Sequence, residues 1–225
     1  MIMIKNRTAQ LIFQTVYCVL AVIGIFSSTG YFVADFNSDF YVYYTNLSNY
    51  ICAAVMFITL INTAKCANKG ESGYCTTAPA FNFMCVIMIM VTFLVYNILL
   101  SGDSTVVQYF TSLNNMLLHV ILPIMFILNF ALFYERKSIK WFYPFLSMVM
   151  PLIYVVFIVI RAAILKGATN TVLYPYFFLN IDDLGWGGFF VWVSVLLVIF
   201  IVIGYVLFAL DNFKTIKNRL TQKEK

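Results

Sequence analysis

The sequence has 225 residues, of which 63% are hydrophobic and only 10% are charged, and its mean hydropathy is +0.91. A soluble domain carries roughly a quarter of charged residues, so this chain cannot cover a water-exposed globule and lipid must be the solvent for most of it. The net charge of +5 does not indicate nucleic-acid binding, because its position along the chain has a simpler explanation.

Six apolar segments reach the roughly 20 residues that a spanning helix needs. We predict an all-α protein, a bundle of six transmembrane helices that forms one domain over residues 1–225 and leaves no room for a soluble domain. A short basic segment precedes the first span without a cleavage site, so we expect this span to be retained. The predicted spans are 10–34, 40–62, 80–101, 108–134, 144–165 and 187–210.

Lys and Arg residues gather in alternate connecting segments. Twelve of the 14 lie in the N-terminal tail, segments 63–79 and 135–143, and the C-terminal tail, whereas the opposite loops carry five aspartates. Because basic loops stay in the cytoplasm, we expect both termini there. A reading with five or seven helices scatters these charges over both faces. The localisation predicted is therefore a multi-pass protein of the cell membrane.

The five cysteines give no metal-binding or disulfide pattern. Cys18, Cys52 and Cys85 lie inside apolar segments, while Cys66 and Cys75 share a loop assigned to the cytoplasm, where disulfides are rare. The spacing of the last two matches no metal motif, and the only histidine lies elsewhere. We predict ordinary free cysteines, no metal and no cofactor.

The second span begins with a polar stretch, in which Thr45, Ser48 and Asn49 are spaced to share one helical face. One interpretation is hydrogen bonding between helices, which is common for these residue types in membranes. The other is a functional site, since polar groups at membrane depth are costly unless they are used.

The fourth span contains His119, the only histidine, with Asn115 one turn earlier on the same face. Pro123 leaves the backbone carbonyl of His119 without its usual helical partner. The imidazole can be a buried structural group held by a neighbouring hydroxyl or carbonyl. It can also transfer protons near neutral pH, for which histidine is the best suited side chain.

Depth allows Thr45 and His119 to meet. If the hydrocarbon begins near Phe40 in the second span and near Leu113 in the fourth, both side chains lie about 8 Å deep. If the fourth span enters at Gln108 instead, His119 lies about 16 Å deep and the two miss each other. The polar residues that follow Gln108 suit an interface and favour the first placement.

Arg161 lies near the outer end of the fifth span. It can reach the interface, pair with Asp182 or Asp183, or bind the carboxylate or phosphate of a ligand. Few other charges approach the hydrocarbon, which disfavours an ion-coupled transporter. The loop from Tyr174 to Asp183 is aromatic and predicts a cap at the membrane surface.

Four sequence strings resemble one known family. In chain order they are YYTNLSN, LLHVILPIMFIL, PLIYVVFIVIRAAI and LYPYFFLNIDDLGW. They are similar to the androgen-induced-gene-like membrane proteins and most closely to their bacterial branch, called Pr-six-Pr, from the second helix to the sixth. The resemblance implies a bacterial six-helix protein and, from the animal relatives, a threonine hydrolase that cleaves fatty-acid esters of hydroxy fatty acids. It maps the nucleophile onto Thr45 and the base onto His119.

Two positions depart from the family pattern. His119 stands one residue nearer to its proline than the histidine of the animal proteins. Asn180 replaces the aspartate of the bacterial loop motif PFLD, so a role for that carboxylate does not carry over.

A threonine hydroxyl needs a base and an oxyanion hole to attack an ester. Alternatives that remain are acyl transfer by the same residues and non-catalytic binding of a lipid or small molecule. The expected partners are the bilayer and a lipid ester, with no nucleic acid and no obligate protein partner. The candidate oxyanion or supporting residues are Asn46, Asn49, Asn115 and Ser48, and the candidate substrate-binding residues are Arg161, Asp182, Asp183 and Tyr174.

Overall fold

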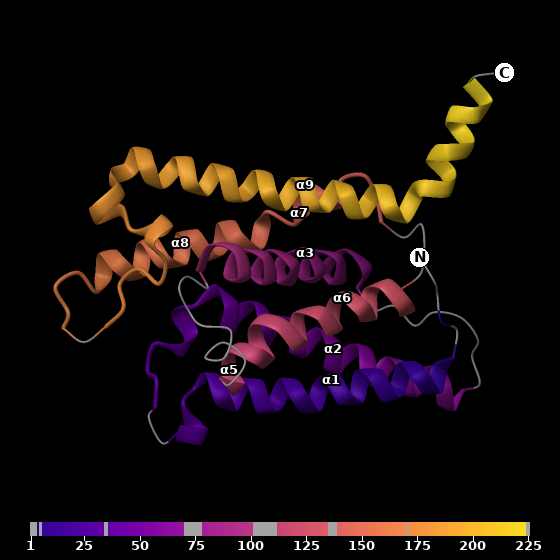
Figure 1. Cartoon of the computed structure of the whole chain (residues 1–225), viewed down its shortest axis with the longest axis horizontal. Coiled ribbons are helices and arrows are strands. Elements are labelled where there is room, and N and C mark those ends of the chain that lie inside the picture. The colour runs from indigo at the N-terminus through magenta and orange to yellow at the C-terminus, as the bar shows by residue number, and fades with distance from the viewer. Residues whose placement is uncertain are drawn as a thin grey trace.

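The computed structural model describes residues 4, 6–33, 36–69, 78–100, 112–134, 139–169 and 171–223. Within these ranges every regular element is a helix, and six helices are long and apolar enough to cross a membrane. The predicted all-α bundle of six spanning helices is confirmed. Both ends of the chain lie toward the same end of the bundle (Figure 1), as an even number of spans requires. Cys75, the acidic Asp103 and the basic pair at 136–137 lie outside the described residues.

Several of the spans are built from more than one helical element. The third ends in a π-helical turn, the fourth contains one, and the fifth begins with a short helix. In chain order the elements are α1 (Arg7–Ser28), α2 (Tyr44–Asn68), α3 (Pro79–Val95) with a π turn at Tyr96–Leu100, α5 (Leu113–Met116) with a π turn at Leu117–Ile121, α6 (Leu122–Phe133), α7 (Tyr143–Leu146), α8 (Val149–Ile164) and α9 (Ile181–Lys223), besides 3₁₀ turns at Tyr31–Val33, Phe40–Val42 and Phe177–Leu179.

The ends of two spans differ from the sequence-based prediction for local reasons. The first helix stops at Ser28, before the predicted end at 34, and Gly30 follows with a positive φ of 79° that suits glycine. The last span begins at Ile181, before the predicted start at 187. There the side chain of Asn180 accepts hydrogen bonds from the N–H groups of Asp182 and Asp183 at 3.1 and 3.3 Å, which caps the new helix.

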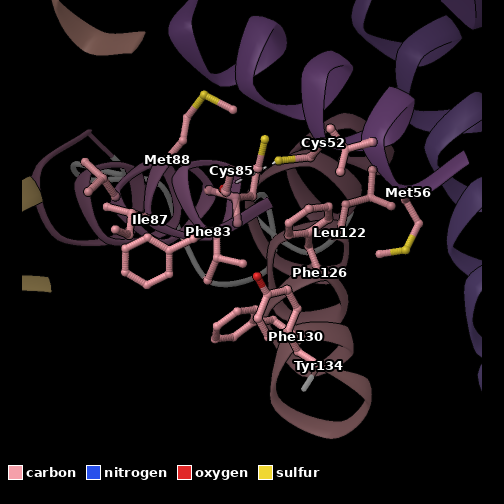
Figure 2. Close-up of a cluster of buried hydrophobic side chains, with 14 of the residues drawn as sticks. Cys52, Met56, Phe83, Cys85, Ile87, Met88, Leu122, Phe126, Phe130 and Tyr134 are labelled. Atoms are coloured by element: carbon pink, nitrogen blue, oxygen red, sulfur yellow. Dashed lines mark hydrogen bonds between the residues drawn. The ribbon is translucent and has the colours of Figure 1, made fainter. Parts of the chain in front are cut away.

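The centre of the bundle is α3, which lies between the group formed by α1, α2 and α6 and the pair α8 and α9 (Figure 1). Its side chains are the most buried of the molecule, and many of them belong to one apolar cluster shared with α2 and α6. Figure 2 shows this cluster, in which Phe83 meets Phe130 at a ring-centroid distance of 6.3 Å. The outward faces of α1, α8 and α9 expose large apolar side chains, as expected where lipid replaces water.

Two glycines allow close approach between helices. A Cβ at Gly24 of α1 would lie 3.0 Å from the side chain of Leu118, and a Cβ at Gly204 of α9 would lie 2.9 Å from Pro144 of α7. The first contact lies near the end of α1 at Ser28 and the second beside the short helix α7, so neighbouring helices pack closely toward both ends of the bundle.

Candidate functional site

A cavity lies in the outer half of the bundle, between α2, α3, α8, α9 and the loop that precedes α9. Its empty volume is about 590 Å³, including the open space at its mouth, and its walls are almost entirely apolar. Mostly apolar walls with a few polar groups are typical of small-molecule sites. The lining residues are Tyr44, Thr45, Val91, Thr92, Val95, Tyr96, Leu100, Pro151, Tyr154, Val155, Tyr176, Phe178, Leu179, Val193, Leu196, Leu197 and Phe200.

Thr45 lies on the wall of this cavity in the first turn of α2. The residue before the helix, Tyr43, is extended and offers no side-chain cap, so the first N–H groups of α2 have no partner within the helix. The N–H of Thr45 donates to the hydroxyl of Tyr176 at 3.4 Å, which is long for such a bond. The start of α2 therefore presents a weakly engaged donor beside the threonine hydroxyl.

Tyr176 reaches Thr45 from the loop before α9. Its ring stacks on Phe178 at a centroid distance of 5.0 Å and meets Tyr43 edge-on at 6.3 Å. Burial raises the pKa of Tyr176, while hydrogen bonding from the Thr45 side chain and from the first N–H groups of α2 acts in the opposite direction. The hydroxyl is thus protonated at neutral pH and is held against the threonine.

The other polar residues of the second span bond helices to one another. The hydroxyl of Ser48 lies 2.9 Å from that of Thr92 on α3. The amide of Asn49 donates to the carbonyl of Thr45 at 2.8 Å and to that of Leu118 at 3.0 Å. Both amide protons of Asn49 are engaged in this way, so neither is available to an oxyanion in this geometry.

The remaining candidate donors differ from Asn49. Asn46 donates to the carbonyl of Phe40 at 2.8 Å, which leaves one amide proton. Asn115 is half-buried, and its backbone N–H donates to the side chain of Ser112, the N-cap of α5. Neither Asn46 nor Asn115 lines the cavity around Thr45.

Pro123 disturbs the fourth span as predicted. The N–H of Leu122 bonds to Leu117, five residues earlier, and proline has no N–H, so the carbonyls of Leu118 and His119 lose their helical partners. Side chains from two other helices take these places. Asn49 of α2 donates to Leu118, and Asn97, in the π turn after α3, donates to His119 at 3.2 Å. π turns of this kind are frequent at functional sites.

The imidazole of His119 stacks on the ring of Tyr96 at a centroid distance of 3.3 Å and an interplanar angle of 21°. Its Nδ1 is buried and makes no hydrogen bond of normal geometry. The imidazole interacts with the backbone of Asn115, one turn earlier. Tyr96 lines the cavity around Thr45, whereas His119 does not. Tyr96 is therefore the cavity-lining residue that contacts the imidazole.

Arg161 has a different partner from those predicted. Its guanidinium pairs with Asp39 of the first outer loop at 2.7 Å and with the hydroxyls of Tyr41 and Thr171 at 3.3 and 3.0 Å. It also donates to the carbonyl of Val172, whose N–H donates to Asp39 at 2.9 Å. The side chain is only 6% exposed. Arg161 joins two outer loops to α8, and four of its five N–H donors are engaged, so most of its bonding capacity is used within the protein and little is left to anchor a ligand carboxylate.

The three other predicted substrate-binding residues lie apart from the cavity. Asp182 pairs with Lys166 at 3.4 Å on the surface, and Asp183 bonds to the side chain of Asn180. Tyr174 is half-buried, and its pKa is raised by desolvation and by the neighbouring charge of Asp182. None of the three lines the cavity around Thr45.

Four residues of the site escaped the sequence analysis: Thr92, Tyr96, Asn97 and Tyr176. Thr92 and Asn97 are polar residues within an apolar span, so the criterion that selected Thr45 would have found them. Tyr176 lies in the aromatic loop that was singled out, but no pattern distinguishes it from its neighbours. Among the described residues no group of three His, Cys, Asp or Glu could hold a metal ion.

Comparisons with known proteins give no relative: no family model, no curated protein and no solved structure matches this chain.

Proposed function

We propose that this chain is an intramembrane hydrolase of lipid esters, in which Thr45 is the nucleophile and His119 is the base. The observation that carries the proposal is the position of Thr45 on the wall of a mostly apolar cavity, in the first turn of a helix that is long and apolar enough to span a membrane. Apolar walls suit the chain of a fatty ester, and the ester group at its end would meet the hydroxyl. The resemblance to the androgen-induced-gene-like proteins supports the same assignment and a place in a bacterial cell membrane.

The reaction follows from the chemistry of these two side chains. The Thr45 oxygen attacks the ester carbonyl carbon and its proton passes to His119, since a hydroxyl is a weak nucleophile without a base. The carbonyl electron pair moves to its oxygen and returns when the bond to the leaving alcohol breaks. His119 gives its proton to that alcohol. Water then attacks the acyl-threonine and releases the fatty acid and the free hydroxyl.

The stack of Tyr96 on His119 sets a condition for this reaction. Because Tyr96 lines the cavity and covers the imidazole, its ring must leave the stack before His119 can take the proton of Thr45. Tyr96 begins the π turn at the end of α3, where the regular hydrogen-bond ladder is already broken, so a small rearrangement moves this ring. We therefore assign Tyr96 as the gate between the cavity and the base.

Hydrolysis by purified protein tests the proposal. Detergent-solubilised wild type is compared with Thr45→Ala and His119→Ala on a fatty-acid ester of a hydroxy fatty acid and on simple long-chain esters. Removal of either group is expected to lower kcat by about 10³-fold or more. Thr59→Ala is the matched control, because Thr59 is a buried threonine of the same helix whose hydroxyl bonds to its own helix at 2.8 Å.

The labelling pattern provides a second readout. A fluorophosphonate probe is expected to modify Thr45 of wild type and of the Thr59→Ala variant, as read by mass spectrometry, but not of Thr45→Ala. Equal hydrolysis by wild type, Thr45→Ala and His119→Ala would remove the enzyme assignment. Transfer of the acyl group to an added alcohol in preference to water would identify an acyltransferase with the same residues.

One observation favours a second function, the binding of a lipid without turnover. His119 is absent from the lining of the cavity, and its stacked, buried position resembles a structural histidine. In that case the cavity holds an acyl chain and the ester is not cleaved. Native mass spectrometry would then show a retained lipid that is lost in a variant with a filled cavity, such as Val193→Trp, while no variant changes a rate of hydrolysis.

A further inference from the structure

The hydroxyl of Tyr176 lies next to the proposed nucleophile, Thr45, in a position that bears on ester cleavage. It lies at the start of α2, where it accepts the N–H of Thr45 at 3.4 Å and interacts with the Thr45 side chain. An ester carbonyl attacked by the Thr45 oxygen must bring its own oxygen within a few ångströms of that side chain. The surroundings of the Tyr176 hydroxyl are therefore those that the developing negative charge would meet.

We propose that Tyr176 is a catalytic residue of the hydrolase, whose hydroxyl, together with the N–H of Thr45, donates hydrogen bonds to the ester carbonyl oxygen as it becomes negative. This role holds only if the hydrolase function proposed above holds. It replaces the asparagine donors expected from the sequence, because Asn49 has no amide proton left and neither Asn46 nor Asn115 lines the cavity.

Both donors are available to a substrate. The bond from Thr45 N–H to Tyr176 is long, so exchanging it for a bond to a charged oxygen gains energy. Burial raises the pKa of Tyr176, so its hydroxyl keeps its proton at neutral pH and can donate. No proton is transferred in this step: the hydroxyl stabilises the oxygen while charge is present and releases it when the tetrahedral intermediate collapses.

The loop holds this hydroxyl in place before substrate arrives. The Tyr176 ring is fixed between Phe178, on which it stacks, and Tyr43, which it meets edge-on. The Tyr176 carbonyl accepts the N–H of Leu179 at 3.0 Å within the 3₁₀ turn. Donors that need no reorganisation during the reaction are those that contribute most to rate, and a tyrosine clamped by aromatic neighbours meets that requirement.

The test compares Tyr176→Phe with wild type and with Tyr31→Phe, which removes a hydroxyl from an exposed tyrosine of the first outer loop. Loss of one oxyanion donor is expected to lower kcat by about 10²-fold while KM changes little. The same proteins are assayed with an oxygen ester and with its thionoester, in which sulfur replaces the carbonyl oxygen. Sulfur is a poor acceptor, so the ratio of the two rates is expected to fall in Tyr176→Phe and to stay constant in Tyr31→Phe.

The outcomes distinguish the role of Tyr176 from the hydrolase function itself. An unchanged kcat in Tyr176→Phe, or a lower kcat with an unchanged rate ratio, overturns the role of Tyr176 while Thr45-dependent hydrolysis stands. Hydrolysis that does not depend on Thr45 overturns the enzyme function and the role of Tyr176 together. Thermal unfolding in detergent and fluorophosphonate labelling of Thr45 accompany the assay, so that a fall in rate caused by misfolding is recognised.

Discussion

Two polar clusters lie near the outer surface, and they differ in how completely their polar groups are hydrogen-bonded. Around Arg161 the charges are paired, with Asp39 accepting from both the guanidinium and the N–H of Val172. Near Thr45, in contrast, two groups at the cavity are weakly bonded or unpaired. The N–H of Thr45 has a partner only at 3.4 Å, and the hydroxyl of Tyr44 is buried with none.

This difference separates structural from functional polarity. A buried charge pair with most of its donors and acceptors hydrogen-bonded fixes the arrangement of its helices and loops and has little left for a ligand. Unsatisfied polar atoms beside an empty apolar volume keep their bonding capacity for something else. The contrast supports a structural role for the Arg161 cluster and the proposed ligand chemistry for the Thr45 cluster, although sequence reasoning had considered both as ligand sites.

Breaking the charge pair is expected to have the largest effect on stability. Arg161→Met leaves Asp39 in a nearly buried position without its counter-ion, which costs about 3 kcal/mol of unfolding free energy. Unfolding in mixed detergent micelles, followed by tryptophan fluorescence, measures this loss. The rate of ester hydrolysis per folded molecule is expected to change little.

The double variant Arg161→Met with Asp39→Leu is the control for this prediction. Removing both charges is expected to recover most of the loss, because the unpaired carboxylate is the main cost. A single variant as stable as wild type would show that the pair contributes nothing. A single variant that keeps its stability but loses lipid binding would return Arg161 to the ligand site.

Asn97→Leu is expected to have an intermediate effect, because it removes the donor that pairs with the carbonyl of His119 at 3.2 Å. The expected loss of unfolding free energy is about 1 kcal/mol, the usual size of a hydrogen bond between membrane helices. Asn212→Leu is a matched control. The Asn212 side chain also donates to a carbonyl four residues earlier, as Asn97 does to Phe93, but among the described residues it makes no bond to a second helix.

The cause can be isolated with Pro123→Ala, which supplies the missing N–H to the carbonyl of His119. In that background Asn97→Leu is expected to cost less than in wild type, and a double-mutant cycle measures the difference. An equal cost in both backgrounds would mean that Asn97 acts through something other than the carbonyl that proline leaves open.

The sequence predicted the bundle well and the site only in part, for physical reasons. Apolar length and the alternation of basic loops set the number and orientation of spans, because lipid enforces both locally. The loss of the backbone partner of His119 was also predictable, since it depends only on Pro123. Which ring covers His119 and which carboxylate meets Arg161 depend on packing between distant segments. Asp182 and Asp183 are nearer to Arg161 along the chain, yet Asp39 is the partner.

The smallest effect on stability is expected for Tyr44→Phe. Tyr44 lines the cavity, and its hydroxyl is buried and makes no hydrogen bond. Removing this hydroxyl therefore loses no interaction and relieves the cost of burying an unpaired group. The unfolding free energy is expected to stay within about 0.5 kcal/mol of wild type or to rise slightly. Tyr154→Phe is the matched control, because its hydroxyl donates to the carbonyl of Val42 at 2.8 Å, and it is expected to lose about 1 kcal/mol.

If Tyr44→Phe proves as destabilising as Tyr154→Phe, the Tyr44 hydroxyl contributes to folding. The polar groups near Thr45 would then stabilise the fold as those around Arg161 do, and the contrast between the two clusters would be wrong. If it is neutral for unfolding but weakens retention of a lipid in the cavity, the unpaired hydroxyl belongs to the ligand. Each of these two phenylalanine variants removes a single hydroxyl oxygen. Comparing them therefore distinguishes a polar group that stabilises the fold from one that binds a ligand in the cavity.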